Sequence, residues 1–303
     1  MLTSQGYYQA ARALYERALA IFELMHGPDH PDTSTILNNF ALLLSMIGEY
    51  EAARSFHERL LAIREQTLGS NHGSTATSLN NLALLLHTIG DSNAARPFYE
   101  RALAIHETIS GSDHQDTALS LHNLAHLFTD LGKYEEARPL YERALAINEA
   151  VVGPYHPNTA LNLDNLAVLL TALGEYESAR PLFERSLVIG EKALGPDHPN
   201  IATTLNNLGN LQYKLGEYEA SRQLCERSLA IYEKQLGTDH LHTATSLNNL
   251  AQLLHTIGDY EAARPLHERA LAIYETILGL GHPDTLNSRN NLAILLKALS
   301  DSA

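Results

Sequence analysis

Histidine is the residue type whose abundance first suggests chemistry, because the chain of 303 residues contains 16 of them and a neutral imidazole is a common metal ligand. His122 and His126 are four residues apart, a spacing that places both on one face of a helix. Together with the carboxylate of Asp164 they could hold a transition metal. The residues between them are Asn-Leu-Ala, so the glutamate of the metalloprotease motif is absent. We therefore favour a polar patch that contacts a ligand, and we predict no metal and no cofactor.

Other residues that could carry out catalysis show no such grouping. No serine, histidine and carboxylate follow the spacing of a catalytic triad, and the glycines stand singly rather than in a phosphate-binding loop. An active site also requires polar groups that converge in an apolar pocket. We predict that the chain has no catalytic residue and is not an enzyme.

Seven histidines mark an internal repeat, because they recur every 42 residues without an insertion. A fixed period of this length is typical of a solenoid of stacked units. Packed helices are about 8–10 Å apart, whereas a ligand nitrogen lies about 2 Å from a zinc ion, so these histidines do not share a metal. We expect them to pack and to form hydrogen bonds around helix starts. They are His30, His72, His114, His156, His198, His240 and His282.

Each repeat predicts two helices, for example residues 75–89 and 91–109, with a single glycine ending the first. The fold class predicted is all-α: a right-handed α-solenoid of antiparallel helix pairs with about 14 helices. We predict one domain over residues 1–303. It consists of a half repeat with only a second helix (1–30), six full repeats (31–282) and a half repeat with only a first helix (283–303). This arrangement suggests a piece of a longer array in a larger protein.

The charge balance excludes nucleic acid, since the net charge is −14 and only 21 residues are Lys or Arg. Fourteen of these occupy two repeating positions, represented by Arg54 and Arg59, and Arg54 lies four residues before Glu58 on one helical face. No apolar stretch approaches the length that spans a membrane, and the first residues do not resemble a signal peptide. Cys225 is the only cysteine, at a position held by aromatic side chains in most other repeats. We expect a cytoplasmic protein.

The repeat also resembles a known family. The pattern Leu-x-x-Leu-Ala followed by Gly-x-Tyr-x-x-Ala-x-x-x-Tyr-x-x-Ala, over residues 121–144, is similar to the tetratricopeptide repeat. The length of 42 residues, the Leu-Asn-Asn-Leu-Ala of residues 79–83 and the Leu-Gly-x-x-His-Pro connector resemble the kinesin light chain variety, which also occurs in bacterial multidomain proteins. The resemblance implies a protein without enzymatic activity that binds peptides in a concave groove lined by the first helices.

The groove residues are expected on the outward stripe of each first helix. Asparagine stands at the position of Asn81 in all seven first helices, and an amide both donates and accepts hydrogen bonds. The resemblance implies that this asparagine binds the main chain of a peptide; an asparagine ladder that ties neighbouring first helices together is an equal alternative. The predicted groove residues are Asn39, Asn80, Asn81, His87, His122, Asn123, His126, Asp164, Asn165, Asn206, Asn207, Asn210, Tyr213, Lys214, Asn248, Asn249 and His255.

The expected partner differs from that of kinesin light chains, whose grooves resemble one another in capturing acidic peptides with basic residues. Here the stripe offers only Lys214 and Lys297, so a neutral or mildly basic protein or peptide segment is the better match. We predict a non-catalytic protein-interaction module that binds neither nucleic acid nor a membrane. The alternative is a scaffold that associates head to tail through its unpaired terminal helices. The expected oligomeric state is a monomer or a weak head-to-tail self-association.

Overall fold

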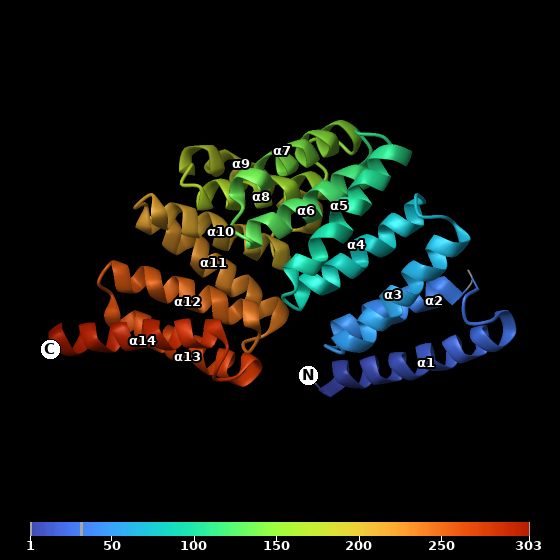
Figure 1. Cartoon of the computed structure of the whole chain (residues 1–303). Helices are drawn as coiled ribbons and strands as arrows, with labels where there is room; N and C mark the ends of the chain where they lie inside the picture. The colour runs from blue at the N-terminus through green and yellow to red at the C-terminus, as the bar shows by residue number, and fades with distance from the viewer. Residues whose placement is uncertain (1, 31–32, 303) are drawn as a thin grey trace. The chain divides into compact units, whose positions relative to one another are not determined.

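The computed structural model describes residues 2–30 and 33–302, and these residues form fourteen helices and no strand (Figure 1). The predicted all-α class is therefore confirmed. In chain order the helices are α1 (Leu2–His26), α2 (Thr33–Met46), α3 (Tyr50–Thr67), α4 (Gly73–Thr88), α5 (Ser92–Ile109), α6 (Gln115–Asp130), α7 (Tyr134–Val151), α8 (Pro157–Ala172), α9 (Tyr176–Leu194), α10 (Pro199–Lys214), α11 (Tyr218–Leu236), α12 (Leu241–Thr256), α13 (Tyr260–Leu278) and α14 (Pro283–Ser302).

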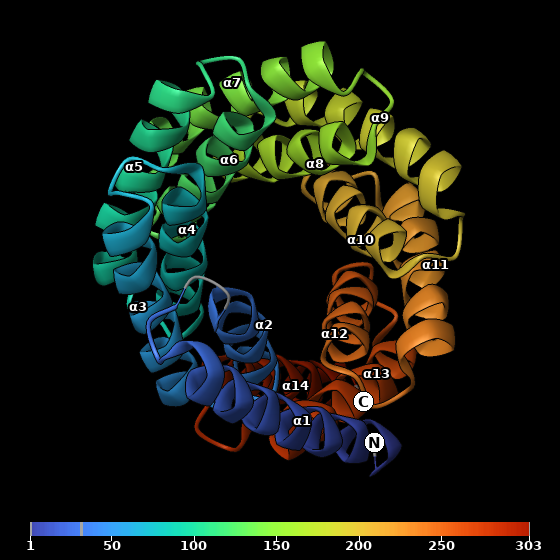
Figure 2. The same ribbon diagram turned by 90° about the vertical axis from the view of Figure 1, so that its right-hand side faces the viewer.

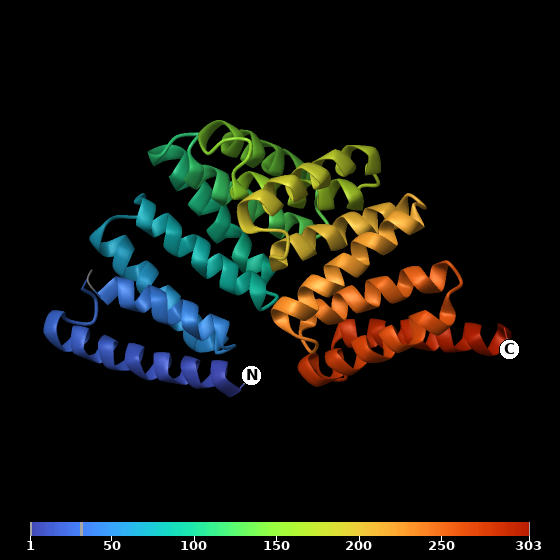
Figure 3. The same ribbon diagram turned by 180° about the vertical axis from the view of Figure 1, so that it is seen from behind.

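A short turn around one glycine folds each first helix of a repeat back against the second. Gly90, between α4 and α5, has a φ of +86°, a backbone conformation that residues with a Cβ atom rarely adopt. Its N–H and that of Asp91 donate to carbonyl oxygens of the last turn of α4, at 2.9 and 2.8 Å, which satisfies groups that a helix end leaves free. The result is an antiparallel pair, and Figure 3 shows α12, α13 and α14 (orange to red) running side by side.

The repeated histidine begins the first helix of a pair. In α10, His198 is the residue before the helix, and its Nδ1 atom accepts a hydrogen bond of 3.1 Å from the N–H of Asn200. A side-chain acceptor at this position satisfies one of the free N–H groups of the first turn. The expectation that these histidines form hydrogen bonds at helix starts is confirmed at six positions, namely His72, His114, His156, His198, His240 and His282.

The chain divides into two compact units, Met1–Val151 and Val152–Ala303, and each unit is a stack of helix pairs. We call α2, α4, α6, α8, α10, α12 and α14 the A helices and the remaining helices the B helices. Within each unit the A helices form one layer and the B helices a second, and the A layer lies on the inner side of the curved stack (Figure 2). Neighbouring A helices of a unit also lie in contact with each other, for example α4 with α6 and α10 with α12. The assignment of all residues to one domain stays a prediction.

The core lies between the two layers of each unit. Leu79, Leu82 and Leu86 of α4 are buried, and Ala53 and Ala95 on the B helices are fully buried. The small alanines allow the close helix contacts that the repeat requires. Cys225 is buried as well, and burial raises the pKa of its thiol to about 11. This environment agrees with the packing role expected for it.

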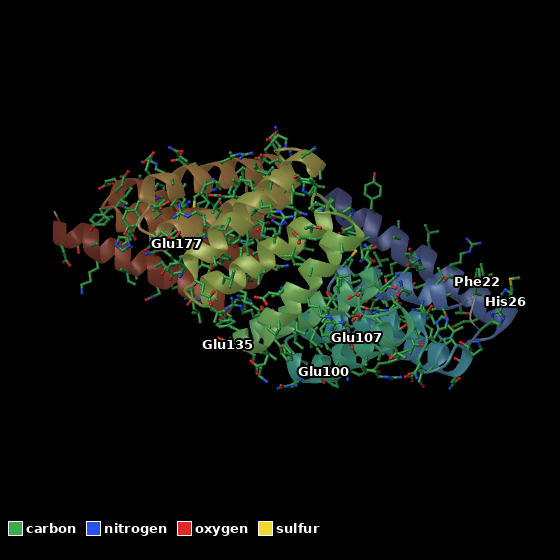
Figure 4. All side chains as sticks on the ribbon, turned by 90° about the horizontal axis from the view of Figure 1, so that it is seen from above. Phe22, His26, Glu100, Glu107, Glu135 and Glu177 are labelled. Atoms are coloured by element: carbon green, nitrogen blue, oxygen red, sulfur yellow. The ribbon has the colours of Figure 1, made fainter. Side chains whose placement is uncertain are left out.

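The two repeated arginine positions are occupied by ion pairs along the B helices. Arg96 contacts Glu100 within α5 at 2.6 Å, and Arg143 on α7 contacts Glu107 on α5 at 2.5 Å; Figure 4 labels both glutamates. Arg54 and Glu58 pair in the same way at 2.8 Å, as their spacing predicts. Because these exposed pairs use most of the basic side chains, little positive charge remains for other contacts. No helix among the described residues combines the length and the apolar composition needed to cross a membrane.

Candidate functional site

The predicted groove residues all lie on A helices, and most are accessible. Exposed members are Asn39, His126, Asn210 and Lys214. Half-buried members are Asn81, His87, His122, Asn123, Asn165, Asn207, Tyr213, Asn248, Asn249 and His255. Asn80, Asp164 and Asn206 are buried, so a ligand could reach them only through an opening in the surface. We call the side of the A layer that faces away from the B helices the A face. It carries the exposed and half-buried members.

The repeated asparagine links some neighbouring A helices by a side-chain hydrogen bond. Its Nδ2 atom donates to the side chain 43 residues earlier. The bonds run from Asn81 to Asn38 (3.0 Å), from Asn207 to Asp164 (3.0 Å) and from Asn291 to Asn248 (3.4 Å). The ladder expected as one alternative is therefore present at these three steps.

The ladder is interrupted at two other steps. The Oδ1 atoms of Asn80 and Asn206, which Asn123 and Asn249 would reach by the same geometry, are buried and accept no hydrogen bond within the described residues. Asn80 instead donates to Ser120 Oγ on α6 at 3.1 Å. No side-chain hydrogen bond of Asn123 or Asn249 is present in the described part of the chain. Helix bracing therefore does not account for the amide at these two positions.

The A face contains a hollow in each unit, at equivalent repeat positions. In unit 1 the His126 hollow, about 350 Å³, is lined by Leu84, His87, Thr88, Tyr99, His122, Asn123, His126 and Asp130. In unit 2 the Asn210 hollow, about 240 Å³, is lined by Val168, Thr171, Ala172, Phe183, Asn207, Asn210 and Lys214. Each residue of the second list stands two repeats after a member of the first. Helix packing with a 42-residue period therefore produces the same depression twice, with different side chains around it.

At the next equivalent position in unit 2, between α10 and α12, a hydrogen bond crosses the space. Tyr213 OH and Thr256 Oγ1 are 2.9 Å apart. These residues stand three repeats after His87 and Asp130, whose side chains are 2.8 Å apart in the His126 hollow. The same link between A helices is thus made by different residue pairs.

A further pocket of about 320 Å³ lies between α8, α9 and α10, and we call it the Asp164 pocket. Its lining consists of Pro157, Asn158, Ala160, Leu161, Asp164, Ser186, Gly190, Leu194, Asn200, Ile201, Thr203 and Thr204. Most of this surface is apolar, and the Asp164 carboxylate is its one charged group. Pockets of this kind bind ligands through apolar contact and a few oriented polar groups.

The pocket follows from the absence of a side chain at Gly190. In the next two repeats this position carries Tyr232 and Tyr274, whose hydroxyl groups bond to threonines of their own A helices at 2.7 and 2.9 Å. Ile201 replaces the threonine of the other repeats and occupies part of the space, because its Cδ1 atom would lie 2.6 Å from a Cβ atom at Gly190. The remaining volume leaves room for about one side chain.

Asp164 lines this pocket and has one carboxylate oxygen without a hydrogen-bond partner among the described residues. Its Oδ2 atom accepts from Asn207, but its Oδ1 atom is buried and accepts no hydrogen bond within the described residues. The hydroxyl of Thr204 is near, yet it donates to the carbonyl oxygen of Asn200 at 3.4 Å. Burial raises the pKa of Asp164 to about 6, partly offset by Thr204 and Asn207. A buried carboxylate with a free acceptor favours a cation or a hydrogen-bond donor as its ligand.

The histidine pair considered for a metal is arranged differently from the expectation. The ring of His122 packs against Tyr141, with ring centroids 5.6 Å apart. The second histidine beside His126 is His87, at a ring distance of 5.4 Å. The spacing of four residues within one helix therefore did not identify the partner, which lies on the neighbouring A helix.

Sequence reasoning missed Gly190, Leu161 and the threonines of the Asp164 pocket. The signal for them was an interruption of the repeat: the position of Gly190 carries Phe22, Arg64, His106, Asn148, Tyr232 and Tyr274 in the other repeats. The residues that recur in every repeat predicted the A face. The residues that differ from the repeat, such as Gly190, mark the Asp164 pocket.

Comparison with known proteins agrees with this architecture. The family model described as tetratricopeptide repeat matches residues 1–66, 47–108, 116–187, 160–224, 200–276 and 257–303. The chain belongs to the tetratricopeptide repeat family. Modules of this family generally mediate protein–protein interactions, and they are typically non-catalytic.

Solved structures confirm the resemblance to the kinesin light chain variety. A protein from Podosopora anserina described as a kinesin light chain with nearly identical TPR-like repeats is 27% identical, with a TM-score of 0.57, and the match covers 68% of this chain and 97% of that one. BtubC (BKLC) from P. vanneervenii is 24% identical, with a TM-score of 0.61 over 78% of this chain and 92% of that one, and shares the fold. The search among curated proteins gave no match.

Proposed function

We propose that the chain is a non-catalytic interaction module whose A face binds an extended peptide or protein segment. The recurring hollow of the A face carries this proposal. Two hollows of about 350 and 240 Å³ occupy equivalent positions, and each has enough volume to receive a side chain. Successive side chains of an extended segment point to opposite sides, so one side chain can enter the hollow of a unit while the main chain of the segment lies along the A face of that unit.

The unused amides of the A face support main-chain recognition. Asn123 lines the His126 hollow, and Asn249 lies at the same repeat position on α12. An amide that is not engaged by a neighbouring helix can donate to a peptide carbonyl oxygen and accept from a peptide N–H, independent of the peptide sequence. We therefore assign Asn123 and Asn249 to ligand binding and the ladder residues Asn81 and Asn207 mainly to bracing.

The Asp164 pocket supports a basic residue in the partner. A lysine or arginine side chain would place its stem against Leu161 and Ile201 and its charge near the Asp164 carboxylate. This assignment agrees with a neutral or mildly basic segment and disfavours an acidic one. A single cysteine forms no internal disulfide, which is compatible with the cytoplasmic location that we propose.

Selection from a library of random peptides displayed on phage tests the proposal. We expect the selected peptides to share a lysine or arginine, and a synthetic peptide to bind Asp164→Asn at least about tenfold more weakly than the unchanged chain. Gly190→Tyr should have a similar effect, because the new ring would occupy the pocket as Tyr232 does in the next repeat. Selected peptides without an enriched basic position, or variants that both bind the peptide as tightly as the unchanged chain does, would contradict the role of the pocket.

Self-association is the second candidate function, and exposed apolar residues at the terminal helices favour it. On α1, Leu14, Leu24 and Met25 are 68, 88 and 69% exposed, and on α14 Ile294 is 50% exposed. Apolar patches of this kind mark interaction surfaces. Light scattering over a range of concentrations tests this: a molar mass that rises with concentration, and that returns to one chain when Leu24 and Met25 become Lys, supports head-to-tail assembly. A constant mass of one chain contradicts it.

A further inference from the structure

The His126 hollow brings together three side chains that are typical metal ligands. His87 Nε2 lies 2.8 Å from Asp130 Oδ2, and His126 Nδ1 lies 3.5 Å from the same oxygen. One ligand atom from each of the three residues lies within 4.8 Å of the other two. Ligands about 2 Å from a tetrahedral zinc ion are about 3.3 Å from each other. The three groups are therefore close to the separations that a metal would impose.

The chemistry of the donors matches a divalent first-row transition metal. Two imidazole nitrogens and one carboxylate oxygen suit zinc and its neighbours, whereas magnesium and calcium prefer oxygen ligands. Three protein ligands leave the fourth tetrahedral position to water. The side chain of His87 is only 12% exposed and is held in place, while those of His126 and Asp130 are each 50% exposed and can adjust.

Of the two hollows described above, only the His126 hollow brings two histidines and a carboxylate together. In the Asn210 hollow the equivalent residues are Thr171, Asn210 and Lys214, and an ammonium group would repel a cation. Between α10 and α12, Tyr213 and Thr256 make the interhelical hydrogen bond that His87 and Asp130 make here. Bridging two A helices therefore does not require two histidines and a carboxylate.

We propose that His87, His126 and Asp130 form a binding site for a zinc-type divalent metal ion, which bridges α4 and α6. The proposal is independent of peptide binding, because it depends only on the three ligands and their separation. The metal would cross-link two neighbouring A helices of unit 1 and occupy the floor of the His126 hollow.

Calorimetric titration of the full chain, prepared without a histidine tag and treated with a chelator, tests the proposal with Zn²⁺ as the probe. We expect one tight site per chain. His87→Ala and His126→Ala should each weaken it at least about tenfold, with unchanged helix content by circular dichroism. The side chain of His126 is 50% exposed, so His126→Ala is expected to fold normally even if His87→Ala, at the more buried position, does not.

His255→Ala is the matched control, since His255 occupies the position of His87 four repeats later. There Ile294 and Ala298 stand in place of His126 and Asp130, so no equivalent site is present. This variant should bind Zn²⁺ as the unchanged chain does. The absence of a tight site in the unchanged chain, or equal binding by all three variants, would overturn the proposal. Co²⁺ provides a second readout, because its visible absorption reports four-coordinate geometry.

Discussion

The Nδ2 atom of Asn207 on α10 donates a hydrogen bond of 3.0 Å to Asp164 Oδ2 on α8. At the equivalent steps the acceptors are the neutral amides of Asn38 and Asn248. Asp164 thus places a carboxylate at a position where an amide makes the same hydrogen bond. Its second oxygen has no hydrogen-bond partner within the described residues, and the residue lines the Asp164 pocket.

Asp164→Asn should therefore stabilise the protein at neutral pH. Burial raises the pKa of Asp164 from its ordinary value of 3.8 to about 6, so the folded state holds the proton more tightly than the unfolded state. Stability from this group is full below pH 4 and falls as the pH rises through 6, by about 3 kcal/mol in the limit. Denaturant unfolding at pH 4.5 and 7.5 measures this. Relative to the unchanged chain, Asp164→Asn should gain stability at pH 7.5; an equal difference at both pH values would contradict the assignment.

His57 has the opposite pH dependence. It is 1% exposed, and burial lowers the pKa of its imidazole from 6.5 to about 4. As the pH falls below 6.5 the unfolded chain takes up a proton that the folded chain does not, so about 3 kcal/mol of stability is lost by pH 4. The equivalent position holds Phe183, so His57→Phe is expected to fit.

The difference in unfolding free energy between His57→Phe and the unchanged chain should grow as the pH is lowered from 7.5 to 4.5. Phe183→His provides the reverse exchange in another repeat, and it should introduce acid sensitivity. If His57→Phe shifts stability by the same amount at every pH, the imidazole is not kept neutral by burial.

Bracing and binding should separate when single asparagines of the A face are changed. Asn207→Ala removes the hydrogen bond to a buried carboxylate and should destabilise the protein by about 1–3 kcal/mol. Asn123→Ala removes no hydrogen bond of the described structure and should change stability by less than about 0.5 kcal/mol. Thermal unfolding followed by circular dichroism measures both. Equal losses would show that Asn123 braces the helices as Asn207 does.

The helix-start histidines should be replaceable only by other side chains that accept hydrogen bonds. His198→Ala leaves the N–H of Asn200 without its acceptor at 3.1 Å and should destabilise the start of α10 by about 1 kcal/mol, whereas His198→Asn should retain most of the stability. Amide hydrogen exchange in the first turn of α10 checks this. Unchanged exchange in His198→Ala would remove the capping role.

The 42-residue period was sufficient to predict the helix pairs, the turns and the A face. Every hydrogen bond of the ladder, in contrast, joins residues 43 positions apart, and this offset depends on how neighbouring helices slide against each other. The sequence alone therefore left bracing and binding as equal alternatives for Asn81 and Asn123. His87 and Asp130, which lie beside His126, are also 43 positions apart. Because the sequence alone does not reveal this offset, His126 was matched with His122 on its own helix.

The Asp164 pocket was not predicted because it depends on residues that differ from the repeat, whereas the repeat pattern predicts only what its copies share. Two departures from the repeat occur in the same unit. Gly190 has no side chain where the other repeats have a large one, and the apolar Ile201 replaces a polar threonine. Each change alone reads as an ordinary substitution. Their proximity, which creates the pocket, is a property of packing between α9 and α10.

Peptide affinity of the double variant Asn123→Ala, Asn249→Ala tests the central claim most directly. Fluorescence anisotropy with a labelled, library-selected peptide gives the dissociation constant, and Asn93→Ala, an exposed asparagine on the B helix α5, is the matched control. If the A face binds the main chain of the peptide, the double variant should lose at least about tenfold in affinity with unchanged helix content, and the control should bind normally. Equal affinity of the double variant and the unchanged chain would contradict recognition through the A face.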